Sequence, residues 1–184
     1  MRRLGAIVAT AAVLAGCATA PAPAPLPEAP LLRLAPAALG RSLNQQQQIS
    51  VSAPGRAPQR AELLLEVDAQ AVRLAVFGLG QTAARLEWDG RQLRQQRAPW
   101  WPAAVSGERI LSELQLALWP ADAVRAALPA GWTLQVGADG RRLLWADRPV
   151  MTIRHEAPGR TELVNERDGY RLLIEAQDLE EARP

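Results

Sequence analysis

Apolar and polar residues alternate over many short segments of the chain, which is the pattern of strands with one buried face. In the clearest segment, residues 60–69, Leu63, Leu65 and Val67 alternate with polar residues. Asp-Gly and Pro-Gly pairs, which favour hairpin turns, separate many of the segments. Further strands are predicted at residues 45–53, 72–76, 85–88, 91–97, 132–136, 141–146, 150–156, 161–166 and 170–177. About ten strands in consecutive hairpins form an antiparallel sheet that must curl.

Two short helices are predicted between the strand segments, over residues 106–119 and 120–128. Ser106 is a suitable N-cap for the first helix, and Pro120 fits the first position of the second. The apolar stripe of the first helix contains Ile110, Leu111, Leu114 and Leu118, and the residues expected to point away from it are Arg109, Glu113 and Gln115. Such one-sided helices fit the hollow of a curled sheet. The predicted fold is therefore mainly β, a half-open barrel with two short helices as a lid.

The N-terminal residues have the pattern of an export signal, because a basic start precedes an uncharged stretch, residues 4–15. The tetrad Leu14-Ala15-Gly16-Cys17 resembles the lipobox of bacterial lipoproteins. This resemblance implies cleavage before Cys17 and attachment of diacylglycerol to its sulfur, with acyl chains such as palmitate as the anchor. Ala18 implies the outer membrane, since aspartate at that position commonly retains lipoproteins in the inner membrane. The alternative is an ordinary secreted protein with an accidental cysteine.

Composition divides the chain into three parts. Residues 1–16 are the expected signal peptide, residues 17–32 the lipidated cysteine with an Ala/Pro-rich tether, and residues 33–184 the half-barrel domain. Alternating Ala and Pro favours polyproline II, which at ~3.1 Å per residue would reach on the order of 40 Å. We expect the domain to lie at the periplasmic face of the outer membrane, lipid-anchored and monomeric.

Charge and candidate chemistry exclude several classes of function. The chain has 21 basic and 19 acidic residues, and loss of Arg2 and Arg3 with the signal balances the charge, which disfavours nucleic-acid binding. Cys17 is the sole cysteine and His155 the sole histidine, so we expect no metal site and no cofactor. A Gly-x-Ser-x-Gly motif is absent. An enzyme, such as an acyl hydrolase or transferase, is therefore not expected.

Four segments carry a family resemblance: LGRSLNQQQ at residues 39–47, LQLALWP at 114–120, LPAGW at 128–132 and GYRL at 169–172. Together they resemble a family of bacterial outer-membrane lipoproteins known as domain of unknown function 3261, with a LolA/LolB-like fold. Folds of that type enclose a hydrophobic cavity for lipoprotein acyl chains, and members of the family often accompany gene clusters for aryl-polyene-type lipids. The resemblance implies a lipid or acyl-chain ligand and, as a possible partner, a LolA-like periplasmic carrier.

The resemblance to LolB also suggests one membrane-contact residue. LolB-like proteins have an exposed leucine in a Leu-Gly pair after the third strand, and the matching segment here is Phe77-Gly78-Leu79-Gly80-Gln81-Thr82. Leu79 is therefore the candidate for a membrane-contact loop. The alternative is a glycine-rich hairpin whose leucine packs into the core. Gly78 stands where LolB-like proteins usually have proline, which departs from the pattern.

Tryptophans give a second set of candidates. Trp100 and Trp101 lie between two prolines just before the first helix, so they are candidates for the mouth of a cavity, as Leu114 and Leu118 are for its lining. Core packing is an equal alternative for the tryptophan pair, and it is the better reading for Trp88, Trp132 and Trp145. The favoured function is binding of acyl or aryl-polyene-type lipid, or of lipoprotein acyl chains, for transfer or assembly. The alternative is a structural adaptor that docks a partner protein.

Overall fold

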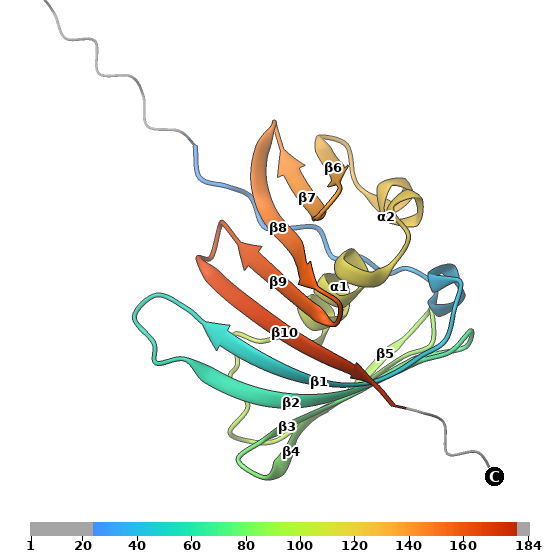
Figure 1. Ribbon diagram of the computed structural model, residues 1–184, viewed down its shortest axis with the longest axis vertical. Coiled ribbons are helices and arrows are strands. Elements are labelled where there is room, and N and C mark those ends of the chain that lie inside the picture. The colour runs from blue at the N-terminus through green and yellow to red at the C-terminus, as the bar shows by residue number, and fades with distance from the viewer. Residues whose placement is uncertain (1–23, 180–184) are drawn as a thin grey trace, which may run out of the picture.

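A single sheet of ten antiparallel strands forms the framework of the protein (Figure 1). The computed structural model describes residues 24–179. In chain order the elements are η1 (Pro36–Leu39), β1 (Leu43–Ser52), β2 (Gln59–Val67), β3 (Val72–Gly78), β4 (Gln81–Trp88), β5 (Leu93–Arg97), α1 (Gly107–Leu118), α2 (Ala121–Ala127), β6 (Trp132–Gly137), β7 (Gly140–Trp145), β8 (Arg148–Ala157), β9 (Arg160–Asn165) and β10 (Tyr170–Asp178). The mainly β fold with ten strands and two helices confirms the prediction.

The strand order is β5-β4-β3-β2-β1-β10-β9-β8-β7-β6, so the first and last strands of the chain pair at the centre of the sheet. Ile49 of β1 lies opposite Ala61 of β2 on one side and Ile174 of β10 on the other. Register shifts within β3–β4, β7–β8 and β8–β9 mark bulges or irregularities, which bend strands. The sheet curls, and its edge strands β5 and β6 do not pair with each other.

The concave face of the sheet carries the core. Leu63, Leu65 and Val67 of β2 are buried there, whereas Leu64 between them is 41% exposed on the outer face. Helices α1 and α2 supply the other side of this core, with Trp119 and Val124 fully buried. Ser106 caps α1 as predicted, since its Oγ accepts a hydrogen bond from the Arg109 amide at 3.2 Å. Both helices therefore fill the hollow of the sheet.

The segment before η1 differs from the expected tether. The sequence predicts the lipidated cysteine and an Ala/Pro-rich tether over residues 17–32, and the structure describes residues 24–32 of this range. Within that part Leu32 is 3% exposed, and Leu26 and Ala29 pack against the core. We call residues 30–35 the strap, because they lie extended along α1 and are hydrogen-bonded to it. The packed unit thus begins before residue 33.

Two further expectations concern the N-terminus and the membrane. The signal peptide and Cys17 lie outside the described residues. Among residues 24–179, none of the helices is both long enough and apolar enough to cross a membrane.

Candidate functional site

The space between α1 and strands β3–β5 is the candidate site, and we call it the chamber. Its lining is apolar: Val72, Leu74, Leu86, Trp88, Leu93, Ile110, Leu111 and Leu114. The remaining void is about 10 Å³, which is room for roughly one water molecule. The concavity expected to hold a lipid is therefore filled by the protein's own side chains at this position.

The predicted cavity residues occupy different places. Leu114 lines the chamber, and Leu118 is partly buried against the core. Trp101 also packs against the core, and its indole Nε1 donates a hydrogen bond to the Val105 carbonyl at 2.7 Å. Trp100 instead remains 47% exposed. The structure therefore separates the tryptophan pair into one packed residue and one exposed residue.

Leu79 lies at the turn between β3 and β4 and is 92% exposed. The reading in which this leucine packs into the core is wrong. Its backbone is in the left-handed region, at a φ of 53°, followed by Gly80 at 73°. The Trp100 ring lies beside the same hairpin, because a Cβ on Gly78 would stand 3.5 Å from Trp100 Cη2. Leu79 and Trp100 thus extend from one small region, which we call the apolar tip.

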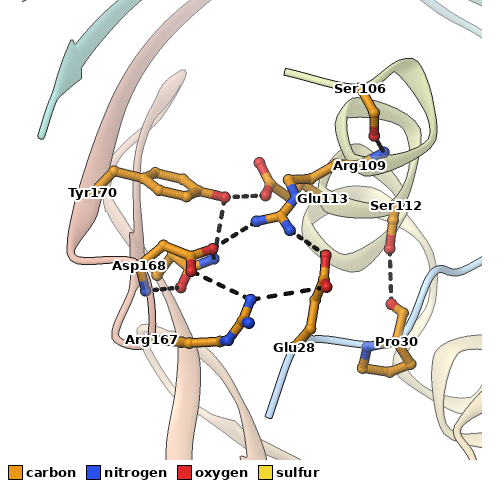
Figure 2. A network of polar contacts seen from close by, with 10 residues as sticks. Glu28, Pro30, Ser106, Arg109, Ser112, Glu113, Arg167, Asp168 and Tyr170 are labelled. Atoms are coloured by element: carbon orange, nitrogen blue, oxygen red, sulfur yellow. Dashed lines mark hydrogen bonds and ion pairs between the residues drawn. The ribbon is translucent and has the colours of Figure 1, made fainter. Parts of the chain in front are cut away.

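A network of polar side chains connects α1 to the β9–β10 hairpin (Figure 2). Tyr170 donates a hydrogen bond to the Glu113 carboxylate, and Asn165 Nδ2 lies 3.2 Å from the Tyr170 hydroxyl. One helical turn away, Arg109 donates to Asp168 Oδ2 at 2.6 Å. We call Arg109, Glu113, Asn165, Asp168 and Tyr170 the clasp. It joins α1 to the β9–β10 hairpin, whereas the chamber lies between α1 and strands β3–β5.

The clasp also reaches the N-terminal segment. Arg109 forms an ion pair with Glu28, which lies 3.8 Å from the Arg167 guanidinium (Figure 2). Arg167 in turn lies 3.3 Å from Asp168. Two arginines and two carboxylates therefore alternate around one point where the N-terminal segment, α1 and the hairpin meet. Such a charge network fixes the relative position of three segments that are distant in sequence.

Burial sets the electrostatics of the clasp. Loss of solvation raises the pKa of Glu113 from its usual 4.5 to about 7, although the Tyr170 hydrogen bond and the Arg109 charge lower it. Burial and the neighbouring Glu113 carboxylate also raise the pKa of Tyr170. A carboxyl group that titrates near neutral pH therefore sits at the contact between α1 and the sheet.

The C-terminal end of α1 is held by a different arginine. Arg141 of β7 donates to the carbonyls of Leu116 and Trp119, at 3.0 and 2.8 Å. These carbonyls belong to the last turn and C-cap of the helix, where a cation is favourable. Burial lowers the pKa of Arg141 from its usual value. Helix α1 is thus attached to the sheet at both ends by arginine contacts.

Candidate metal ligands are not gathered at one place among residues 24–179. The described residues contain no group of three or more His, Cys, Asp or Glu arranged to hold a metal ion. His155 lies exposed on β8, and its Nδ1 is 3.2 Å from the Thr161 hydroxyl. His155 is therefore an exposed residue of the sheet and not a residue of the core.

Sequence reasoning missed both the clasp and the role of one helical glutamine. Gln115 was predicted to point away from the apolar stripe, and this is wrong, because its side chain is fully buried. Its amide oxygen accepts from the Leu34 amide and its amide nitrogen donates to the Leu34 carbonyl. The sequence signal that could have found the clasp is the spacing of Arg109 and Glu113, four residues apart on one helix face.

Two solved structures are similar to the chain in outline. One is a LolA superfamily protein from Nitrosomonas europaea, with 12% identity and a TM-score of 0.42 over 77% of this chain and 87% of that one. The other is a DUF1329 family protein from Desulfovibrio piger, with 9% identity and a TM-score of 0.37 over 76% of this chain and 85% of that one.

The search of curated proteins gives no match to the chain. A family model, described as Protein of unknown function (DUF3261), matches residues 44–178. This range contains every strand and helix from β2 to β10, and nearly all of β1. The chain therefore belongs to the DUF3261 family.

Proposed function

We propose that the protein is a non-catalytic, lipid-anchored protein of the outer membrane that takes up an acyl or aryl-polyene-type chain beneath α1. The observation that supports this is the chamber, whose eight lining residues are all apolar. Apolar burial favours binding by about 0.8 kcal/mol per CH₂ group, so a long chain would gain on the order of 10 kcal/mol before costs. A chamber that admits such a chain needs no polar contact to its ligand.

Under this proposal the structure is the closed form, because about 10 Å³ cannot hold an acyl chain. Helix α1 is the element that moves. It shares no backbone ladder with the sheet and is held through side chains: the clasp at one end and Arg141 at the other. Binding would therefore replace the contacts of Ile110, Leu111 and Leu114 with contacts to the ligand.

The apolar tip gives the proposal a route to the membrane. Leu79 and Trp100 are both exposed and both lie at the β3–β4 end of the domain. A leucine and a tryptophan together suit a bilayer interface, where indole rings are enriched. The lipid anchor proposed at Cys17 would keep this tip near the lipid surface from which a chain is taken or to which it is delivered.

Titration with a fluorescent fatty acid tests the proposal, using the chain from residue 18 onward without its anchor. We expect saturable binding that Leu114→Gln weakens, because this change places an amide in the apolar chamber. Leu64→Gln is the matched control, since Leu64 lies on the outer face and its substitution should leave the affinity unchanged. Absence of saturable binding, together with no lipid in native mass spectra, contradicts the proposal.

A structural adaptor is the second candidate, and the filled chamber is the observation that favours it. The sheet also ends at the edge strand β6, which pairs with β7 alone and whose Val136 is 50% exposed. Helix α2 covers part of this edge, since Arg125 donates to the Leu134 carbonyl at 3.4 Å. A partner strand could add to this edge. The adaptor is the better description if the fatty-acid titration shows no binding.

A further inference from the structure

The strap lies on α1 as an extended peptide lies in a binding groove. Its alternate leucines have opposite environments: Leu32 is 3% exposed and faces the core, whereas Leu31 is 50% exposed. Leu34 packs against the core and Arg33 is exposed, so the period of two continues along the strap. Alternation of this kind is how extended peptides present side chains to a groove.

Two polar residues of α1 form hydrogen bonds with the main chain of the strap. The Leu32 amide donates to Ser112 Oγ at 2.9 Å, and this hydroxyl donates to the Pro30 carbonyl at 3.1 Å. The Leu34 amide donates to Gln115 Oε1 at 2.9 Å, and Gln115 Nε2 donates back to the Leu34 carbonyl at 3.0 Å. Ser112 and Gln115, three positions apart on the helix, thus give the main chain of the strap the kind of hydrogen bonds that a neighbouring strand would give it.

Two indole groups complete the contacts to the main chain. Trp88 Nε1 donates to the Leu34 carbonyl at 2.8 Å, and Trp119 Nε1 donates to the Ala35 carbonyl at 3.1 Å. Trp88, Ser112, Gln115 and Trp119 are all buried. The strap therefore both covers these four side chains and supplies hydrogen-bond partners for their polar groups, as buried polar groups require. The groove is therefore built to contain an extended chain.

We propose that Trp88, Ser112, Gln115 and Trp119 form an exchangeable peptide-binding site, and that the strap of a second copy of this chain can occupy it. All six hydrogen bonds go to main-chain atoms, so the site does not distinguish its own strap from an identical one. The strap and η1 are joined to β1 through residues 40–42, which are exposed, with Gly40 at a φ of 77°. Exchange of one terminal segment between identical chains recreates the same contacts at low cost.

Charge adds to the fit, because Glu28, just ahead of the strap, pairs with Arg109 on α1. The strap of a second copy would therefore bring its own Glu28 to pair with Arg109 of α1.

Two complementary full-length chains, both carrying Cys17→Ser, test this proposal. Leu32→Asp disables the strap, because it places a carboxylate in the core, and Gln115→Leu disables the groove by removing two of the hydrogen bonds. Alone, each chain should be monomeric by native mass spectrometry. Mixed, they should form a one-to-one heterodimer, in which the intact strap of the Gln115→Leu chain occupies the intact groove of the Leu32→Asp chain.

Leu31→Asp is the matched control, because Leu31 points away from the groove. Its own strap stays bound, so mixing it with the Gln115→Leu chain should give no heterodimer. A mixture of the Leu32→Asp and Gln115→Leu chains that remains monomeric, while circular dichroism shows both chains folded, overturns the proposal.

A peptide titration covers the case in which Leu32→Asp fails to fold. Fluorescein-labelled peptide with the sequence of residues 28–37 is titrated into the milder Leu32→Ser chain, and anisotropy reports binding. We expect saturable binding that Gln115→Leu, added to the same chain, weakens at least about tenfold, for two lost hydrogen bonds. Equal affinity with and without Gln115→Leu, or no binding to either chain, overturns the proposal.

Discussion

Tyr170 on β10 donates a hydrogen bond to Glu113 on α1, across 57 positions of sequence. This contact attaches the helix that closes the chamber to the strand that completes the sheet. Its acceptor is a buried carboxyl group whose pKa is raised to about 7. The contact between helix and sheet is therefore sensitive to pH in the neutral range.

Glu113→Gln should remove a pH dependence of stability. The pKa of Glu113 is higher in the folded protein, about 7, than its usual 4.5, so the contribution of this group is fully present below pH 4.5 and is lost as pH rises through 7. We expect the free energy of unfolding of the variant to rise relative to that of the wild type over this window, by about 3 kcal/mol at pH 8. Urea unfolding between pH 4 and 8 measures this. Parallel pH profiles for the two proteins would contradict the prediction.

Tyr170→Phe should destabilise the protein by about 1 kcal/mol, because the Glu113 carboxyl loses a buried hydrogen-bond donor. The Tyr170 hydrogen bond lowers the pKa of Glu113, so its removal should move that pKa further above 7. Carbon-detected NMR titration of the Glu113 carboxyl reports this directly. A pKa that falls in the variant would show that the hydroxyl does not stabilise the carboxylate.

Leu79→Glu should weaken binding to lipid vesicles while leaving the fold intact, because the side chain is exposed at the apolar tip. We expect a loss of about tenfold in the partition coefficient for the chain without its anchor, as one apolar side chain contributes roughly 1.5 kcal/mol or more. Vesicle sedimentation measures the partition. Leu64→Glu, on the outer face, is the control and should leave it unchanged. Equal loss in both variants would mean that the tip is not a specific contact.

Gly140→Ala should destabilise the pairing of β7 with β8. A Cβ at this position would stand 2.0 Å from the Ile153 carbonyl oxygen of β8, so the strands would have to separate. A cost of about 1–3 kcal/mol is expected, seen as a lower midpoint of thermal unfolding. Gly137→Ala, in the β6–β7 hairpin, meets nothing within 4 Å and should be close to neutral. Similar midpoints for the two variants would contradict the steric argument.

The strands and the first helix could be predicted because their signals are local. Alternation along β2 and the Ser106 cap involve residues within a few positions of one another, and each prediction agrees with the structure. Most boundaries differ by one or two residues, as at β1, predicted from residue 45 and observed from Leu43, but β4 was predicted from residue 85 and begins at Gln81.

The strap could not be predicted, because its hydrogen-bond partners on α1 are distant in sequence. The Leu32 amide donates a hydrogen bond to the Ser112 hydroxyl across 80 positions of sequence, and no local pattern of residues predicts that contact. The Ala/Pro composition ahead of the strap carried no information about packing. Gln115 was placed on the polar side for the same reason, since the main-chain groups that satisfy its amide belong to Leu34.

The central position of β1 has a consequence for how the protein is made. Among the strands of residues 24–179, β1 is synthesised first, yet one of its two neighbours is β10, which is synthesised last. The backbone groups of β1 that face β10 cannot form their hydrogen bonds until residues 170–178 have been synthesised. Pairing between strands so distant in sequence makes folding slow. A nascent or truncated copy that ends before Tyr170 keeps an open edge in the middle of its sheet. The topology therefore delays completion of the sheet until β10 has been synthesised.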